Sequence, residues 1–168
     1  DTHCHFDFPP FTGNEEQSID RAAQAGVQAI IVPAIEAAYF DRVQDLARRH
    51  DALYAAIGLH PIVIEHHLDE HIDRLDEILR TPEKKRVAIG EIGLDLYRED
   101  PHFERQQTIL DAQLRLAKQH DLPVILHSRR THDKLALHLK RMNLPRTGVV
   151  HGFSGSLQQA ERFIGLGY

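Results

Sequence analysis

Apolar positions along this chain form two alternating kinds of segment. Short continuous apolar runs, typical of parallel strands covered on both faces, alternate with longer stretches that have apolar residues three or four positions apart, as in amphipathic helices. The pattern predicts strands at 1–5, 29–34, 54–59, 87–91, 123–127 and 148–151. It therefore indicates six strand–helix units joined by right-handed crossovers in a parallel sheet.

Polar residues mark where the predicted helices begin. Asn14 with Gln17, and Ser156 with Gln159, have the spacing of a capping box, in which each side chain bonds a free backbone N–H. The pair at 100–101, Asp-Pro, is expected to cap and start the long helix that follows. Each predicted helix thus begins a few residues after a predicted strand, as a repeated strand–helix unit requires.

Histidine and glutamate stand at the ends of the predicted strands. His3 and His5 are two positions apart, so both project to the same side of the first strand. Glu91, His127 and His151 end the fourth, fifth and sixth strands. Imidazole and carboxylate groups suit zinc, manganese or magnesium, and one carboxylate between two histidine sets could bridge two ions about 3.5–4 Å apart. The pattern predicts a hydrolytic site with two divalent metal ions.

Two α/β architectures fit the strand–helix repeat. A doubly wound open sheet fits the strand number, but the dinucleotide motif Gly-x-Gly-x-x-Gly and a Walker phosphate loop are both absent. A TIM-type (β/α)8 barrel gathers ligands from the carboxyl ends of several strands, as here, and a full barrel needs about 250 residues. We therefore expect a truncated barrel of about six βα units. Residues 1–168 would form a single domain, the N-terminal two-thirds of a metal-dependent hydrolase barrel.

Composition and charge narrow the classes of protein. The formal net charge of −5 argues against bulk electrostatic binding of nucleic acid, but not against an enzyme whose metal ions meet one phosphate at a time. A single cysteine, Cys4, excludes an internal disulfide and fits a reducing cytoplasm. No apolar run is long enough to span a membrane, and there is no signal-peptide pattern. We expect a cytoplasmic protein without membrane association.

Five motifs in order resemble the TatD family of metal-dependent deoxyribonucleases, in its YjjV-like branch, within the amidohydrolase superfamily. They are Asp-Thr-His-Cys-His (1–5), Gly-Leu-His-Pro (58–61), Gly-Glu-Ile-Gly-Leu-Asp (90–95), Pro-Val-Ile-Leu-His-Ser-Arg (123–129) and Val-His-Gly-Phe-Ser-Gly (150–155). The resemblance implies a two-metal site whose shared, catalytic ligand is Glu91. The ligands it implies are His3, His5, Glu91, His127 and His151. It also implies 3′-to-5′ exonuclease activity on DNA, with single strands or 3′ ends as substrate.

The resemblance also implies a ligand that this sequence does not contain. The family takes a further aspartate from the end of strand eight, and no residue here corresponds to it. Two outcomes follow. Either two further βα units complete the site in a longer protein, or the chain is an inactive fragment.

Three residues near the predicted ligands have candidate roles in binding substrate or supporting the metal. His60 ends the third strand and is expected to contact phosphate or a metal-bound water. Arg129 would bind a phosphate through two hydrogen bonds, or else form a salt bridge at the barrel rim. Asp95 would hold the N–H of a ligating histidine, with a structural loop cap as its competitor.

The remaining aromatic and histidine residues have simpler expected roles. Phe6, Phe8 and Phe11 are expected to pack within the loop after the first strand, with base stacking as the alternative. The other histidines are predicted to lie on solvated helix surfaces. They are His50, His66, His67, His71, His102, His120, His132 and His138.

The leading functional hypothesis is a divalent-metal-dependent hydrolase that cleaves phosphodiester bonds of DNA. The alternative is a barrel hydrolase that acts on small amide, lactone or phosphoester substrates, since the same ligand types serve those reactions. The native metal, whether magnesium, manganese or zinc, does not follow from the ligand types alone.

Overall fold

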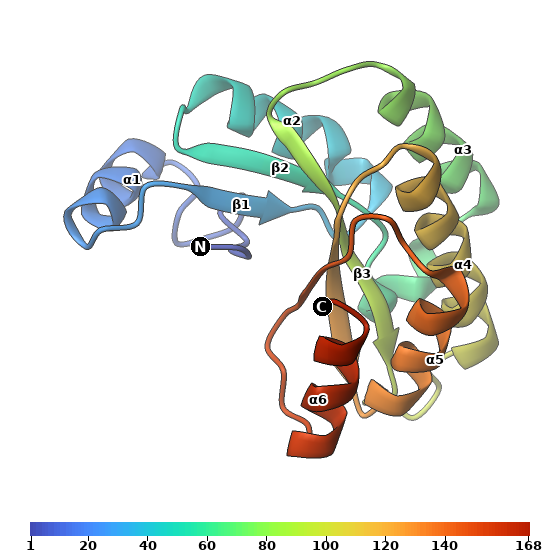
Figure 1. Ribbon diagram of the computed structural model, residues 1–168. Coiled ribbons are helices and arrows are strands. Elements are labelled where there is room, and N and C mark those ends of the chain that lie inside the picture. Colours follow the sequence, from blue (N-terminus) through green and yellow to red (C-terminus); the bar gives the residue numbers. More distant parts are fainter.

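A five-stranded parallel sheet forms the centre of the computed structural model, which describes residues 1–168 (Figure 1). The strands are β1 (Ile30–Pro33), β2 (Leu53–Ile57), β3 (Arg86–Asp95), β4 (Val124–Arg129) and β5 (Gly148–Val150). They pair in sequence order, β1-β2-β3-β4-β5, each parallel to the next. Sequential parallel neighbours with a crossover between them are the arrangement of a βα barrel. The prediction of an α/β, barrel-type fold is confirmed.

Helices connect the strands. They are α1 (Glu15–Gln24), α2 (Phe40–Arg49), α3 (Asp69–Arg80), α4 (Phe103–Gln119), α5 (His132–Met142) and α6 (Leu157–Gly165), with short 3₁₀ turns η1 (Ala37–Tyr39) and η2 (Pro61–His66). In Figure 1 α3, α4 and α5 lie together on one side of the sheet, while α1 and α6 lie at opposite ends of the molecule. No helix combines the length and the apolar character that crossing a bilayer requires.

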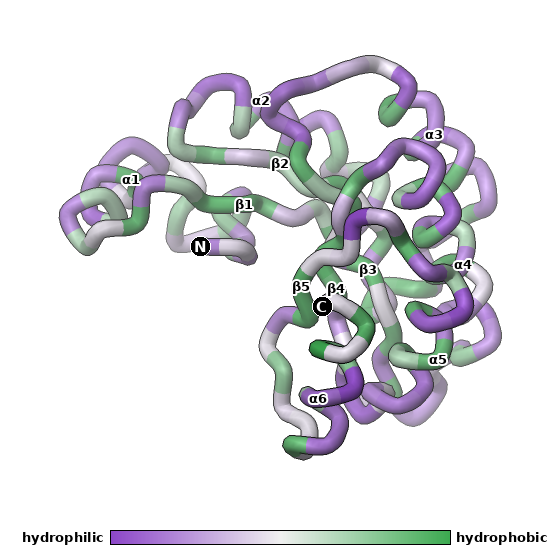
Figure 2. Tube along the Cα trace, viewed as in Figure 1, coloured by the Kyte–Doolittle hydropathy of each residue, from purple (hydrophilic) through white to green (hydrophobic).

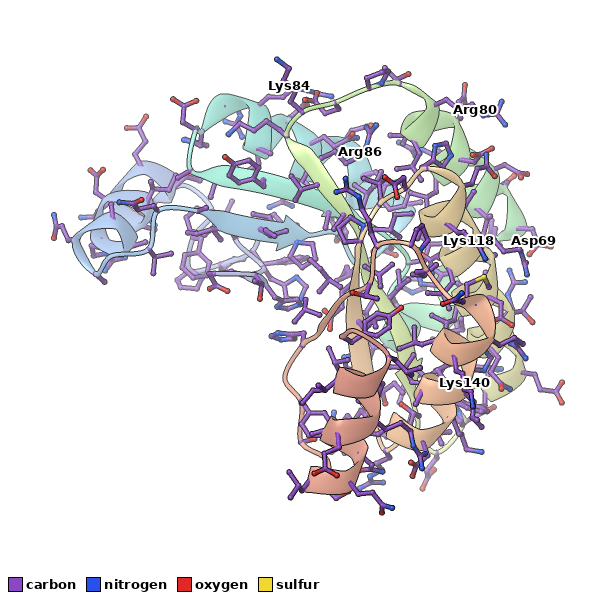
Figure 3. The ribbon with its side chains drawn as sticks, in the orientation of Figure 1. Asp69, Arg80, Lys84, Arg86, Lys118 and Lys140 are labelled. Carbon is purple, nitrogen blue, oxygen red and sulfur yellow. The ribbon has the colours of Figure 1, made fainter.

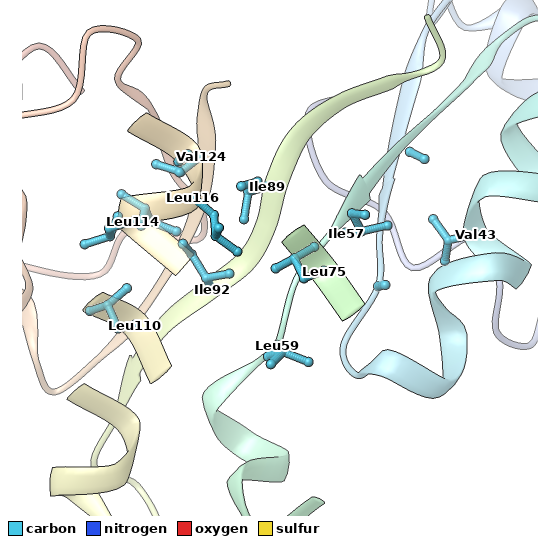
Figure 4. Packing of buried hydrophobic residues seen from close by; sticks show 14 of the residues in the cluster. Val43, Ile57, Leu59, Leu75, Ile89, Ile92, Leu110, Leu114, Leu116 and Val124 are labelled. Atoms are coloured by element: carbon cyan, nitrogen blue, oxygen red, sulfur yellow. The ribbon is translucent and has the colours of Figure 1, made fainter. Parts of the chain in front are cut away.

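The main core lies between the sheet and its helical layer. In Figure 4 Leu110 and Leu114 of α4 pack against Ile92 of β3, and Leu75 of α3 lies between β2 and β3. These side chains are at most 1% exposed. Figure 2 shows the origin of this packing, since the strands are mostly hydrophobic whereas the helices alternate between hydrophobic and hydrophilic positions. Charged residues such as Asp69, Arg80 and Lys84 point outward at the periphery (Figure 3).

The first predicted strand is not a regular strand. Residues 1–5 are extended and lie beside β1, where the amide of Ile31 donates to the carbonyl of Asp1 and the amide of Cys4 donates to the carbonyl of Ile31, both at 3.0 Å. These two bonds hold the segment against the sheet, but they are too few to form a ladder. The prediction of a strand at 1–5 is therefore wrong, although the segment docks at the edge of the sheet.

β3 is longer than predicted and irregular. It runs through Glu91 to Asp95, so Glu91 lies inside the strand and not at its end, as we expected. The pairing register with β4 shifts between Ile89 and Ile92, which is the signature of a β-bulge. Gly90 is required there, because a Cβ at this position would lie 2.7 Å from Cβ of Ile125. The bulge therefore sets the direction in which Glu91 points.

Two of the three predicted helix caps are wrong. Asn14 makes no capping bond, and its side-chain amide donates instead to the carbonyl of Pro10 at 3.4 Å. α4 begins after His102, which has a left-handed backbone with φ of 45°, so the Asp-Pro pair at 100–101 does not cap it. Ser156 and Gln159 form the predicted capping box. A short polar side chain can hydrogen-bond to several nearby backbone groups, and this competition determines whether it caps a helix.

Three histidines predicted on helix surfaces are buried. His67 is 3% exposed, and His132 and His138 are each 8% exposed. Each has a polar partner: the carbonyl of His60 for His67, the Ser128 hydroxyl for His132, and Asp111 for His138. The surface assignment is wrong for these residues because a satisfied imidazole can occupy a core position.

Burial of His67 predicts an acid-sensitive contribution to stability. Burial lowers the pKa of His67 to about 4, whereas an unfolded histidine titrates near 6.5. Between these values the unfolded state binds a proton that the folded state does not, so the free energy of unfolding falls as the pH falls from 6.5 to 4. We expect a loss of up to about 3 kcal/mol from this residue.

Urea unfolding at pH 7.5 and pH 4.5 checks this expectation. His67→Gln should show a smaller acid-induced loss of stability than the unsubstituted protein, whereas the control His66→Gln, which alters an exposed imidazole, should not. Equal pH dependence for all three proteins would show that His67 does not titrate as stated.

Candidate metal centre

The carboxylate of Glu91 lies at the centre of four histidines. It is 2% exposed, and its two oxygens face imidazole nitrogens from three segments of the chain: the extended segment 1–5, the residues after β2, and β4. Its Oε2 lies 2.6 Å from Nε2 of His3, 3.6 Å from Nε2 of His5 and 3.4 Å from Nε2 of His60, and its Oε1 lies 3.1 Å from Nδ1 of His127. One buried anion therefore serves two sets of nitrogen donors.

Each donor owes its position to a local feature of the backbone. The extended segment beside β1 holds the rings of His3 and His5 with centroids 4.7 Å apart and planes at 85°. The bulge in β3 turns Glu91 toward them, and β4 supplies His127 two residues before the strand ends. The structure thus brings these four residues together, while their role as metal ligands stays a prediction.

Within this cluster, the carboxylate of Glu91 and the surrounding imidazoles shift one another's pKa values. Burial by itself would raise the pKa of Glu91, but hydrogen bonds from His127, His3 and His5 outweigh it and hold that pKa far below its ordinary value. Burial opposes protonation of His127, yet its bonds to Glu91 and Asp95 raise its pKa. The raised pKa values of His5 and His127 favour protons that balance the carboxylate. A divalent cation would supply the same positive charge in exchange for those protons.

His127 is oriented by a second carboxylate. Its Nε2 lies 2.7 Å from Oδ2 of Asp95, which is 3% exposed, so Nδ1 is the nitrogen that faces Glu91. A ligating histidine commonly donates its other ring N–H to a carboxylate, which fixes its orientation and raises its basicity. Asp95 therefore occupies the predicted supporting position, although it also accepts a bond from the amide of Tyr97 at 2.7 Å.

Replacing the Asp95 carboxylate should weaken metal binding without abolishing it. We expect Asp95→Asn to lower metal affinity about 10- to 100-fold, because the amide no longer carries the charge that orients His127. Isothermal titration with Mn²⁺ measures the effect, with the exposed Asp100→Asn as the control. Unchanged affinity in Asp95→Asn would assign Asp95 to loop capping only.

His60 differs from the other histidines in its tautomer. The amide of Ile62 donates to Nδ1 of His60 at 3.0 Å, so in the neutral ring the proton sits on Nε2. Burial lowers the pKa of His60, which favours this neutral form. Nε2 therefore presents an N–H to the cluster. This hydrogen-bond donor suits contact with a phosphate or a water, as predicted, better than metal ligation.

His151 lies beside the cluster but not within it. β5 ends at Val150, so His151 occupies the following turn, where its ring stacks on His3 with centroids 3.5 Å apart and planes at 14°. It lines the same pocket of about 450 Å³ as His3, Glu91 and His127. Its role as a ligand stays a prediction.

Arg129 was expected either to bind a phosphate or to form a salt bridge at the barrel rim, and its observed contacts match neither expectation completely. It lines the pocket, as a phosphate contact would, but its side chain is exposed and stacks over Tyr97 with the guanidinium carbon 3.4 Å from the ring centroid. No carboxylate lies within salt-bridge distance, so the expected rim salt bridge is absent. Its place at the pocket leaves the phosphate contact as a prediction.

The loop after the first segment contains a residue that sequence reasoning missed. Asp7 is 2% exposed, and neither of its carboxylate oxygens has a hydrogen-bond partner. Burial raises the pKa of Asp7. The sequence signal that could have identified this buried carboxylate is its position between two phenylalanines, Phe6 and Phe8. Phe6 is buried and stacks on Phe11 at 4.7 Å, which confirms loop packing for these two.

The donor set fits divalent metal ions. Two groups of three residues place one donor atom each within 4.8 Å of one another, namely His3, His5 and Glu91, and His60, Glu91 and His127. Nitrogen donors around one carboxylate are the ligands of transition-metal hydrolytic centres. Glu91 belongs to both groups, which agrees with a shared ligand. Of these five residues, His60 alone has a tautomer that argues against ligation.

Comparisons with known proteins agree with this geometry. The family profile described as TatD related DNase matches residues 1–168. The chain is 68% identical over 168 residues to a protein of Escherichia coli K12 named "Uncharacterized metal-dependent hydrolase YjjV", covering all of this chain and 65% of that protein. It is 35% identical over 162 residues to the "3'-5' ssDNA/RNA exonuclease TatD" of Pantoea ananatis, covering 94% of this chain and 60% of that protein.

A solved structure matches the fold closely. The crystal structure of YJJV, a TatD homologue from Escherichia coli, superposes with a TM-score of 0.98 at 68% identity, covering all of this chain and 65% of that one. The chain thus spans somewhat less than two thirds of the length of these relatives.

Proposed function

Since this chain belongs to the TatD-related DNase family, we propose that it is the N-terminal two-thirds of a divalent-metal-dependent hydrolase that cleaves phosphodiester bonds of DNA. The observation that carries the proposal is the ionised Glu91 carboxylate shared by two sets of histidine nitrogens. We further propose that the activity is a 3′-to-5′ exonuclease on single strands. The printed name of the Pantoea relative supports this finer assignment.

The proposed ligands would hold two divalent ions, and Glu91 would serve both. They are His3, His5, Glu91, His127 and His151. When bound, divalent ions acidify an attacking water and neutralise charge on the phosphoryl oxygens. Glu91 contributes negative charge and not a proton acceptor, because its very low pKa keeps it ionised. Magnesium, manganese and zinc all remain compatible with nitrogen and oxygen donors.

Two further residues act on the phosphate in this proposal. His60 offers the N–H of Nε2, at 3.4 Å from Glu91, to a non-bridging phosphate oxygen. Arg129 offers a planar guanidinium that can form two parallel hydrogen bonds with a phosphate. Both donors position the substrate and stabilise charge that develops on it.

The domain boundary is part of the same proposal. β5 has a strand neighbour only on the side of β4, and an apolar pocket of about 200 Å³ lies between β5 and α6, lined by Val149, Phe163 and Tyr168 among others. We propose that residues 1–168 belong to one domain whose barrel is closed by two further βα units. An extended protein should then remain monomeric in gel filtration, whereas residues 1–168 alone should associate through the open edge.

Cleavage assays with matched substrates test the proposed activity. The full-length protein is incubated with 3′- or 5′-labelled single-stranded DNA, and separately with small amide, lactone and phosphoester substrates, in Mg²⁺, Mn²⁺ or Zn²⁺ and with a chelator. We expect metal-dependent shortening from the 3′ end. Intact DNA in all three metals would contradict the proposal, and turnover of the small substrates alone would assign the protein to the alternative hydrolase class.

A further inference from the structure

An exposed aromatic ring lies beneath two arginines, one of which lines the metal pocket. Tyr97 follows β3 and is 53% exposed. The guanidinium carbon of Arg129 lies 3.4 Å from its ring centroid, and that of Arg130 lies 5.4 Å from it. A tyrosine so exposed contributes little to the core. Its exposure and its two cationic neighbours point to a role at the surface.

These two arginines lack the partners that neutralise others nearby. Arg98, the residue after Tyr97, pairs with Glu65 at 2.8 Å. Arg129 and Arg130 form no salt bridge and contact only the tyrosine ring among charged or aromatic groups. In a chain of net charge −5, two adjacent uncompensated guanidinium groups make a local positive site.

One carboxylate bonds both the backbone of Tyr97 and the metal centre. Asp95 accepts from the amide of Tyr97 at 2.7 Å through Oδ1 and binds Nε2 of His127 at 2.7 Å through Oδ2. The amide of Leu96 also donates to the carbonyl of Arg129 at 3.0 Å, which ties the two segments together. The position of Tyr97 relative to His127 is therefore fixed before any ligand binds, which lowers the entropic cost of binding.

The two arginines face two adjoining pockets. Arg129 lines the pocket of the metal centre, about 450 Å³, and Arg130 lines a polar pocket of about 460 Å³. Ser154 borders both pockets, so they are neighbours. A ligand that extends from the first pocket into the second passes Arg129 and then Arg130, the two residues whose guanidinium groups lie over the Tyr97 ring.

We propose that Tyr97, Arg129 and Arg130 form a ridge that holds the nucleotide next to the one being cleaved. In this inference, which rests on the proposed function, the two guanidinium groups bind successive phosphates and the tyrosine–arginine stack presents a π-face to a base. Stacking on an aromatic side chain together with backbone contacts is how single strands are bound without sequence preference. The ligand class is a single-stranded polynucleotide of at least two nucleotides.

Binding of fluorescein-labelled oligothymidylate to the full-length protein tests the ridge, measured by anisotropy with a chelator present. We expect Tyr97→Ala to weaken binding of a ten-nucleotide strand about tenfold, and Tyr97→Phe to bind as the unsubstituted protein does. Arg130→Ala should weaken binding and reduce its salt dependence by roughly one phosphate contact. Arg115→Ala, an exposed arginine on α4 without a salt bridge, is the matched control and should bind normally.

Hydrolysis of bis(p-nitrophenyl) phosphate with metal separates binding from structural damage. This small diester does not reach the ridge, so Tyr97→Ala should lower its hydrolysis much less than it lowers oligonucleotide binding. Normal oligonucleotide binding by Tyr97→Ala and Arg130→Ala would overturn the ridge, and so would equal loss of small-diester hydrolysis. Oligonucleotide binding that depends on Tyr97 but leads to no cleavage would support the ridge and contradict only the proposed activity.

Discussion

Glu91→Gln should abolish metal-dependent hydrolysis. The substitution keeps the size of the side chain but removes the one negative charge that both histidine groups share. The carboxamide that replaces the carboxylate keeps one oxygen donor but carries no charge, so divalent ions would bind more weakly and their stabilisation of the transition-state charge would be lost. We expect turnover to fall at least about 10³-fold, which corresponds to about 4 kcal/mol of activation free energy. Initial rates on labelled single-stranded DNA measure the change.

Metal content distinguishes a lost ligand from an unfolded protein. Elemental analysis of Glu91→Gln should show less than the normal amount of bound metal, while circular dichroism shows normal helix content. Glu77→Gln alters an exposed carboxylate on α3 and should keep both metal and activity. If Glu91→Gln retained near-normal turnover, the shared carboxylate would not be the centre of the site.

His127→Ala should weaken metal binding and nearly abolish hydrolysis. The substitution removes the nitrogen 3.1 Å from Oε1 of Glu91 and leaves Asp95, a buried carboxylate, without its imidazole partner. An unpaired buried charge also costs stability, about 3 kcal/mol or more, so the variant should melt at a lower temperature. Its defect in metal binding should exceed that of Asp95→Asn, because a ligand is lost and not only its orientation.

Bound-metal stoichiometry again gives the decisive measurement. The control His66→Ala removes an imidazole whose side chain is 61% exposed, and it should keep the normal amount of metal. His127→Ala with unchanged stoichiometry would refute the assignment of His127 as a ligand. A variant that loses metal but keeps its hydrolytic rate would show that this ion is structural.

Regular strands and helices followed from the sequence, and irregular ones did not. The runs around Ile30, Ile57 and Val124 predicted β1, β2 and β4 because continuous apolar segments fit a sheet covered on both faces. The caps at Asn14 and at 100–101 failed because a short polar side chain has several local partners of similar energy. The buried state of His67 was missed because its partner, a carbonyl seven residues away, has no sequence signal.

The sequence by itself determined the family resemblance, the parallel α/β fold and which residue types carry the chemistry. Periodicity and motif spacing are local properties, so they can be read along the chain. Only the tertiary structure decided how those groups meet. His3 and Glu91 are 88 positions apart, and their contact depends on a bulge in β3 and on an extended segment that docks beside β1. The Nε2 proton of His60 and the stacking of Arg129 on Tyr97 likewise arise from hydrogen bonds and packing that form only in the folded chain.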